Sequence, residues 1–212
     1  MNLSFKQYRA VDLFIMAVLL CGAEALITVA ANRWFPWELY VLSPTVAIVC
    51  IVMMRWGGWA VIHAAAGGAA FCVVMGATAE QFAVYCVGNC FSLAALALFK
   101  ALGKEKIRSK YYFTVLFTVT AFFGTQLGRW AVSLFFGGDV GGFVSFVITD
   151  LLSLLFAVVT VLIARRVDGL FEDQKSYLIR TENERKKQRL GKSEYPDNPD
   201  FDGGQDYGGR NF

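Results

Sequence analysis

The sequence has little of what enzymes and nucleotide-driven pumps need. It contains a single histidine, His63, which excludes a histidine-rich metal cluster. It also lacks a Gly-x-Ser-x-Gly nucleophile elbow and a glycine-rich phosphate loop ending in Lys-Ser or Lys-Thr. No obvious inverted repeat with broken helices relates its halves, which disfavours a self-sufficient secondary transporter. We therefore predict that the chain is not an enzyme, uses no cofactor, and depends on another protein for energy if it moves a solute.

A disulfide framework is missing as well. The cysteines are odd in number and all fall inside apolar runs: Cys21, Cys50, Cys72, Cys86 and Cys90. Cys86 and Cys90 share a helix face and would suit a metal pair, but cysteine as a small packing residue is the simpler interpretation. His63 is interpreted in the same way, as a packing or hydrogen-bonding residue.

Charge is scarce in long stretches of the chain. Hydrophobic residues make up 56% of the sequence and the mean hydropathy is +0.48, which is too apolar for an ordinary soluble domain. The apolar residues form continuous runs, and a helix of about 20 residues crosses a bilayer core of about 30 Å. We therefore predict an all-α integral membrane protein with six transmembrane helices, at 12–32, 39–54, 58–77, 81–99, 112–137 and 143–164.

The distribution of Lys and Arg predicts the orientation. If the N-terminus is cytoplasmic, ten Lys and Arg lie on the cytoplasmic side, and only Arg33 and Arg129 lie outside or within the membrane. Both termini are then cytoplasmic, and the second and third helices form a tight hairpin at "RWGG", residues 55–58. The first apolar run is too long for a signal peptide. The expected location is a bacterial cytoplasmic membrane, which the chain crosses several times.

The composition changes abruptly after the sixth run. We predict a six-helix transmembrane domain at 1–166, a cytoplasmic amphipathic or charged helix at 167–190, and a disordered tail at 191–212. From residue 167 onward the chain has eight basic and ten acidic residues. This near-neutral balance suits neither nucleic acid nor anionic lipid. A solvated tail and a docking element for a partner both fit the pattern.

Four polar residues interrupt the apolar runs at one depth. At about 1.5 Å of rise per residue, Glu24, Asn89, Arg129 and Asp150 all fall roughly 10–14 Å below the outer surface. Each stands in a polar stripe at helical spacing, and Tyr85 shares the stripe of Asn89. A charge in hydrocarbon costs at least a few kcal/mol, so such faces turn toward protein or water. We expect the four to meet in a shared cavity open to the outside.

Two interpretations of this level remain open. In the first, an Arg129–Asp150 ion pair locks the last two helices together, with Glu24 protonated, and the role is architectural. In the second, the level is a pocket for a small polar solute. The outer connection "NRWFPWELY" places Trp34 and Trp37 above Glu24, which suits a ring-bearing or heterocyclic ligand.

Together these features resemble the substrate-binding S components of energy-coupling factor (ECF) transporters, over about residues 8–166. The resemblance rests on size, six helices with both ends inside, the hairpin at 55–58, an outer polar level, and small residues spaced by four in the first helix: Ala17, Cys21 and Ala25. It implies a substrate-binding subunit that captures a vitamin-like solute. Arg129, Asp150 and Asn89 would contact that solute, with Glu24 and Tyr85 beside them.

The same resemblance implies partners. The ladder Ala17, Cys21 and Ala25 would dock on a transmembrane coupling subunit, and two cytoplasmic ATPases would drive uptake. Two features depart from the family: Glu24 shares a face with part of the ladder, and the tail after residue 166 is long. The alternative is a membrane scaffold subunit, similar to rod-shape-determining small membrane proteins, whose tail recruits cytoplasmic partners.

Overall fold

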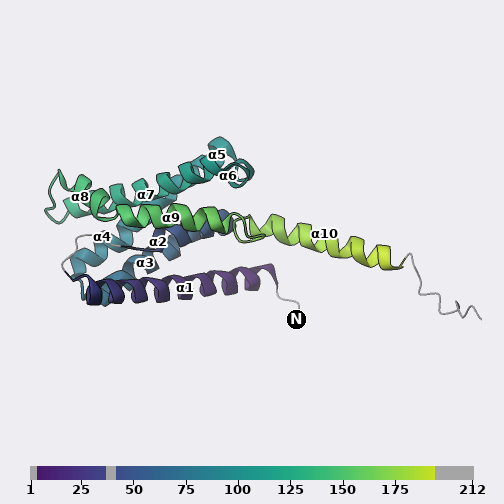
Figure 1. Cartoon of the computed structure of the whole chain (residues 1–212), viewed down its shortest axis with the longest axis horizontal. Coiled ribbons are helices and arrows are strands. Elements are labelled where there is room, and N and C mark those ends of the chain that lie inside the picture. Colours follow the sequence, from purple (N-terminus) through teal and green to yellow (C-terminus); the bar gives the residue numbers. More distant parts are fainter. Residues whose placement is uncertain (1–3, 37–41, 194–212) are drawn as a thin grey trace, which may run out of the picture. The chain divides into compact units, whose positions relative to one another are not determined.

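The computed structural model describes residues 4–36 and 42–193, and every regular element in them is helical (Figure 1). Contacts divide the chain after Gln174 into two compact units. The α-helices are α1 (Phe5–Trp34), α2 (Thr45–Trp56), α3 (Ala60–Met75), α4 (Ala79–Cys90), α5 (Ala97–Leu102), α6 (Lys104–Ser109), α7 (Tyr111–Leu134), α8 (Gly142–Thr149), α9 (Leu151–Ala164) and α10 (Gln174–Ser193). Two 3₁₀ turns, η1 (Gly57–Trp59) and η2 (Phe91–Leu96), join α2 to α3 and α4 to α5.

Fewer helices could cross a membrane than the apolar runs predict. Within residues 4–36 and 42–193, three helical stretches qualify by length and composition, Phe5–Trp34, Thr45–Met75 and Ala79–Leu102, and the bent pair α8 and α9 would make a fourth. These stretches are compatible with a membrane protein, but the six predicted spans are not confirmed. Two local features contribute. Helix α2 has only 12 residues, about 18 Å of helix, and counts only together with α3, and α7 carries Gln126 and Arg129 among its apolar residues.

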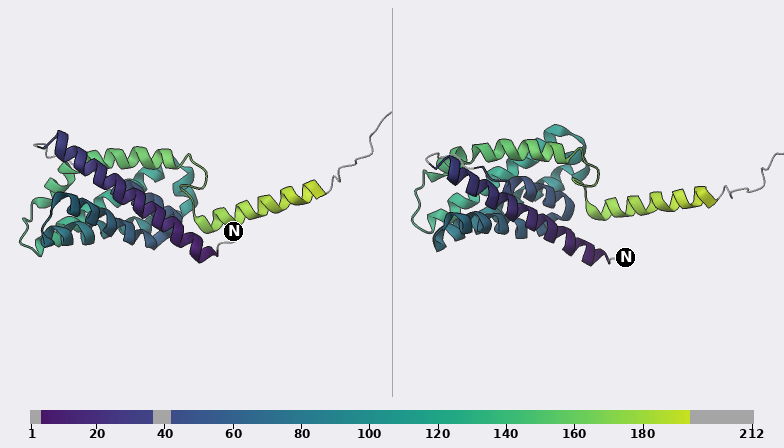
Figure 2. Two further views of the ribbon diagram at one scale, coloured as in Figure 1. Left: turned by 90° about the horizontal axis from the view of Figure 1, so that it is seen from below. Right: turned by 60° about the horizontal axis from the view of Figure 1, so that its bottom comes forward.

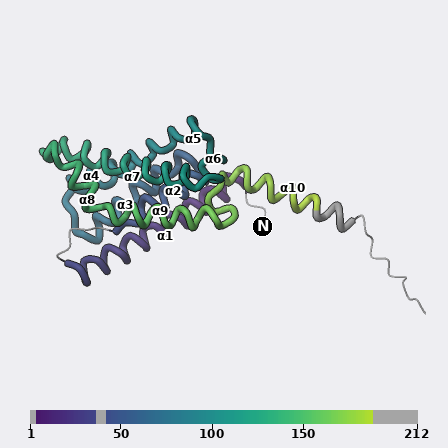
Figure 3. Tube along the Cα trace, turned by 45° about the horizontal axis from the view of Figure 1, so that its top comes forward, coloured from purple at the N-terminus to yellow at the C-terminus, as the bar shows by residue number. Residues whose placement is uncertain are grey.

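Helix α2 forms the centre of the bundle. Ten of its 12 residues are buried, and it packs against α1, α3, α7 and α9 (Figure 3). At the end of α2 Gly57 takes a positive φ of 62°, which glycine adopts without strain, and the chain reverses. Thr45 at the start of α2 therefore lies beside Gly67 of α3, which is the hairpin expected at 55–58.

Helix α1 lies along the outside of the bundle against α3 (Figure 2). It begins at a capping box, in which Ser4 and Gln7 satisfy each other's backbone N–H groups. Only Leu20, Glu24 and Thr28 are buried. These residues are four apart and therefore form one narrow face. Many of its other residues are apolar and exposed, as on a lipid-facing helix, among them Phe14, Val18 and Leu26.

Residues 167–174 fold back on the bundle end opposite the pocket described below, and we call them the clasp segment. Arg55 holds this segment: its Nη1 donates to the carbonyl oxygens of Gly169 and Leu170, at 2.7 and 3.3 Å. The same guanidinium binds both carboxylate oxygens of Asp12 in α1, at 3.0 and 2.6 Å. One buried arginine thus ties α1, α2 and the clasp segment together.

Further ion pairs surround this arginine. Lys104 Nζ lies 2.6 Å from Asp173 and donates to the carbonyl oxygen of Met54. Arg108 Nη1 lies 3.0 Å from Glu172. Between these pairs the ring of Phe171 is buried in the hydrophobic core of the bundle. Both polar and apolar contacts therefore fix the clasp segment.

The clasp segment lies between the bundle and α10, beyond the predicted end of the transmembrane domain. The first compact unit reaches Gln174 instead of residue 166, and the helix expected at 167–190 begins at Gln174 and ends at Ser193. The helix cannot start at 167 because Gly169 has a positive φ of 71° and its carbonyl oxygen accepts from Arg55 and Gln174. The second unit contains most of α10, which is highly charged. Most of the predicted tail, residues 194–212, lies outside the described residues.

Candidate functional site

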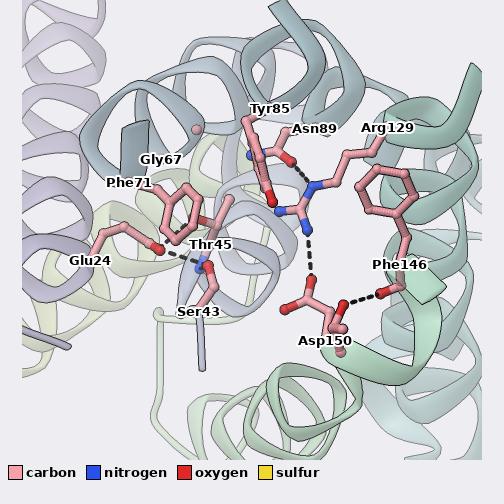
Figure 4. A pocket seen from close by; sticks show the side chains of 12 residues that line it. Glu24, Ser43, Thr45, Gly67, Phe71, Tyr85, Asn89, Arg129, Phe146 and Asp150 are labelled. Carbon is pink, nitrogen blue, oxygen red and sulfur yellow. Dashed lines mark hydrogen bonds and ion pairs between the residues drawn. The ribbon is translucent and has the colours of Figure 1, made fainter. Parts of the chain in front are cut away.

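A pocket in the half of α1 that ends at Trp34 brings together residues from six helices (Figure 4). Its buried floor holds the four polar residues predicted to share one depth, Glu24, Asn89, Arg129 and Asp150. Its half-buried rim is largely aromatic. The free cavity volume is about 20 Å³, enough for one water-sized group. The lining comprises Glu24, Ser43, Thr45, Gly67, Gly68, Phe71, Tyr85, Asn89, Arg129, Phe146, Thr149 and Asp150.

An ion pair between Arg129 and Asp150 lies in the floor. Arg129 Nη1 lies 2.8 Å from Asp150 Oδ2, and both side chains are buried. Gln126 Nε2 donates to the same Oδ2 at 2.7 Å, and Ser153 Oγ donates to Oδ1 at 2.6 Å. Arg129 Nε donates to Asn89 Oδ1 at 2.8 Å. The pair is therefore held by hydrogen bonds on both sides.

Asp150 is positioned by a break in a helix. It stands between α8 and α9, which are bent by 49° relative to each other. Its backbone carbonyl begins α9 by accepting from the N–H groups of Ser153 and Leu154. The partial positive charge of a helix N-terminus favours a carboxylate at this place. The bend thus directs the charged residue of an otherwise apolar run at Arg129 on α7.

Glycines allow the backbone carrying Arg129 to approach α4 closely. A Cβ atom on Gly88 would stand 2.6 Å from the Arg129 Cα, and one on Gly128 would stand 2.6 Å from the Phe91 Cβ. Real Cβ atoms do not come so close, so these two positions require glycine. The close approach lets Asn89, the neighbour of Gly88, reach the guanidinium.

Gly88→Ala should therefore destabilise the bundle by about 1–3 kcal/mol, the usual cost of overpacking. Gly22→Ala is the matched control, because Gly22 is also helical and a Cβ there meets nothing within 4 Å. The control should be neutral or stabilising by about 0.5–1 kcal/mol. Thermal unfolding of both variants in detergent micelles measures the difference. Equal unfolding midpoints would show that α4 and α7 are not packed this closely.

Tyr85 connects the rim to the floor. The Arg129 guanidinium lies over its ring at 4.7 Å, a cation–π distance. On the rim the ring contacts Phe71, with centroids 4.8 Å apart and planes tilted by 44°. Phe146 of α8 lines the pocket as well (Figure 4). Aromatic rings therefore border the space above the charged residues.

Glu24 forms the other half of the floor. It is 1% exposed, and its Oε2 accepts from Ser43 Oγ at 2.7 Å and from Thr45 Oγ1 at 2.8 Å (Figure 4). Ser43 N–H in turn donates to Ser153 Oγ at 2.8 Å, and Ser153 binds Asp150. Hydrogen bonds thus connect the two carboxylates of the pocket through two serines.

Other predicted residues lie away from this pocket. Trp34 is 72% exposed and lines a separate apolar groove of about 520 Å³ with Ile27, Leu42 and Leu152 among others. Trp37 lies outside the described residues. The structure therefore gives Trp34 no contact with the polar floor, and the predicted cap remains a prediction.

The small-residue ladder of α1 is half-buried within the chain itself. Cys21 Sγ lies 3.9 Å from the carbonyl oxygen of Ala66 in α3, and Ala17 and Ala25 are of intermediate exposure. At least Cys21 is thus directed at a neighbouring helix. Docking of a partner on this ladder stays a prediction.

Sequence reasoning missed the two hydroxyls that bind Glu24. Ser43 and Thr45 precede and begin α2 on either side of Pro44. A "Ser-Pro-Thr" start directly before an apolar run was the available signal, since such residues favour helix N-termini. Phe71 and Phe146 were missed because an aromatic residue in an apolar run gives no sign of facing a cavity.

Comparison with known proteins found no match: no family model, no curated protein and no solved structure matches the chain. The chemistry of the site therefore rests on its own residues. A guanidinium, two carboxylates, an amide, hydroxyls and aromatic rings converge on one cavity. Such a set can recognise a small polar molecule by hydrogen bonds and ring contacts.

Proposed function

We propose that the chain is the substrate-binding membrane subunit of an ECF-type uptake transporter, which captures a small vitamin-like or heterocyclic solute in this pocket. The proposal rests on one observation: polar side chains from separate helices converge on a single cavity. Glu24 of α1, Asn89 of α4, Arg129 of α7 and Asp150 at the α8–α9 break line one cavity. A few convergent polar groups with aromatic neighbours are typical of small-molecule sites.

The pocket must open to admit such a solute. Its free volume of about 20 Å³ is far below the roughly 300 Å³ or more of a drug-sized site. The half-buried rim side chains Phe71, Tyr85 and Phe146 are the groups that would move, while the buried floor stays. This structure then corresponds to a closed state of the transporter subunit.

The orientation follows from charge. Arg55, Lys104 and Arg108 lie at the end of the bundle opposite the pocket, with Asp12, Glu172 and Asp173 as partners. By the positive-inside rule this end faces the cytoplasm and the pocket faces outward. Six spans with both termini inside, a coupling subunit and two ATPases complete the proposal, in the cytoplasmic membrane of a bacterium.

A scaffold subunit is the second candidate, and one observation favours it. The Arg129–Asp150 pair is already hydrogen-bonded by Asn89, Gln126 and Ser153, as an architectural pair would be. In this candidate α10 recruits cytoplasmic partners and the pocket stays closed.

Mass spectrometry of small molecules released from the purified full chain tests the first proposal. The wild type should carry a compound that the double variant Arg129→Ala/Asp150→Ala lacks, because this variant removes both charged contacts of the floor. Lys104→Ala/Asp173→Ala is the matched control, since it deletes an ion pair at the opposite end. It should retain the compound.

Two outcomes would count against solute binding. If neither the wild type nor the control carries a compound while all variants unfold alike, the scaffold becomes the better account. A chain ending after Gln174 separates the candidates further, because it removes α10 and keeps the clasp segment with the bundle. Retention of the compound by this chain supports a solute-binding subunit, whereas loss of all activity with an intact ligand site supports scaffolding or partner docking.

A further inference from the structure

The charges of the pocket do not balance. Arg129 and Asp150 neutralise each other at 2.8 Å. Glu24 has no such partner: among the described residues, no Lys, Arg or His nitrogen lies within ion-pair distance of its carboxylate, although the side chain is 1% exposed. With Glu24 ionised, the cavity carries one uncompensated negative charge. An unpaired buried carboxylate is costly in an apolar surrounding, so a cation brought by a ligand is favoured there.

Two hydroxyls donate to the carboxylate of Glu24. Ser43 Oγ accepts from the backbone N–H of Thr45 at 3.2 Å, so its own hydrogen is directed at Glu24 Oε2. Thr45 Oγ1 donates to the same oxygen. Both hydroxyls thus contact Oε2, and neither contacts Oε1. Hydrogen bonds donated to a carboxylate stabilise its charged form, and Oε1 is left for a donor from outside.

The closed pocket favours a small cationic head group, because its buried floor stays in place when the rim opens. A free volume of about 20 Å³ holds one water-sized group. A primary ammonium has about that size and carries three N–H donors, whereas a trimethylammonium is much larger. The aromatic rim of Phe71, Tyr85 and Phe146 offers ring surface to the rest of such a molecule, and ring faces also attract cations.

We propose that Glu24 determines the substrate class of the pocket and that this class is small primary amines, whose ammonium group binds the Glu24 carboxylate while their ring contacts the aromatic rim. The inference rests on the proposed solute-binding function. It adds the charge of the ligand, the atom that recognises it and the size limit of its head group.

Binding of three probes to the purified full chain tests the proposal by isothermal titration in detergent. Benzylammonium has the charge and the small head, benzyl alcohol has the same ring without the charge, and benzyltrimethylammonium has the charge with a bulky head. The wild type should bind benzylammonium at least about tenfold more tightly than either of the others, the usual order for a hydrogen bond to a charged group.

Variants assign the effect to Glu24. Glu24→Gln keeps the shape and should weaken benzylammonium binding by about tenfold or more, with a smaller change for benzyl alcohol. Asp139→Asn is the matched control, because Asp139 is an exposed carboxylate in the α7–α8 connection and does not line the pocket. It should bind like the wild type. Thermal unfolding of each variant shows that it is folded.

Several outcomes would overturn the inference. They are no benzylammonium binding to the wild type, equal binding of benzyl alcohol, or equal binding by Glu24→Gln. If Glu24→Gln fails to fold, the wild type still tests the inference, because it should bind benzylammonium more tightly than the other two probes. A neutral or anionic compound released from the wild type in the mass spectrometry experiment would also overturn the inference, while it would leave the proposed solute-binding function standing.

Discussion

Replacing Arg129 alone with alanine should lower the free energy of unfolding by about 3–5 kcal/mol, the usual result of breaking a buried ion pair from one side. The Asp150 carboxylate would stay buried with its hydrogen bonds from Gln126 and Ser153 but without a cation. Asn89 would lose the donor that reaches its side-chain oxygen at 2.8 Å. Chemical or thermal unfolding in detergent micelles measures the loss.

The double variant Arg129→Ala/Asp150→Ala should recover part of this stability. Removing both partners leaves no unpaired charge, although the polar groups of Asn89 and Gln126 remain without their partners, at about 1–3 kcal/mol each. For this reason the double variant is the right one for testing solute retention. If the single and double variants were equally stable, the two side chains would not interact as the structure shows.

Phe171→Ala should destabilise the bundle by about 3–5 kcal/mol, as large-to-small changes of a buried phenylalanine do. The ring is 1% exposed and lies in the hydrophobic core. Its loss should also release the clasp segment, so limited proteolysis should cut between residues 167 and 174 faster than in the wild type. Unfolding midpoints and cleavage rates measure the two effects.

The neighbouring Val167 supplies the control for this experiment. It belongs to the same segment and is 50% exposed, so Val167→Ala should change stability by less than about 0.5 kcal/mol, as most surface substitutions do. Equal effects at the two positions would mean that the ring of Phe171 does not anchor the segment.

The floor of the pocket could be predicted because polar residues are expensive in apolar helices. Glu24, Asn89, Arg129 and Asp150 stood out for that reason, and counting residues along each helix placed them at one depth. The structure brings all four to one cavity. The hydroxyls of Ser43 and Thr45 could not be predicted in this way. Serine and threonine are common at the start of a helix, where their free-energy cost is small, so they do not stand out in the sequence.

The clasp segment could not be predicted, because its pattern is ambiguous. The apolar residues of this stretch stand at helical spacing with charged residues between them, which resembles an amphipathic helix with a solvated face: Val167, Leu170, Phe171 and Leu178. The deciding features are the backbone of Gly169 and the reach of Arg55, which is more than 100 residues earlier in the chain. A contact over such a distance leaves no periodic trace in the sequence.

The contacts of Arg55 also fix the order in which the protein can be completed during translation. Residues 12 and 55 leave the ribosome first, so the guanidinium can meet the Asp12 carboxylate early. Its carbonyl partners, Gly169 and Leu170, are made only after the last helix of the bundle. Until then Arg55 lacks half of its hydrogen bonds. The bundle is therefore finished by residues that follow its last apolar segment, and a nascent chain stopped at residue 166 would hold an incompletely bonded arginine.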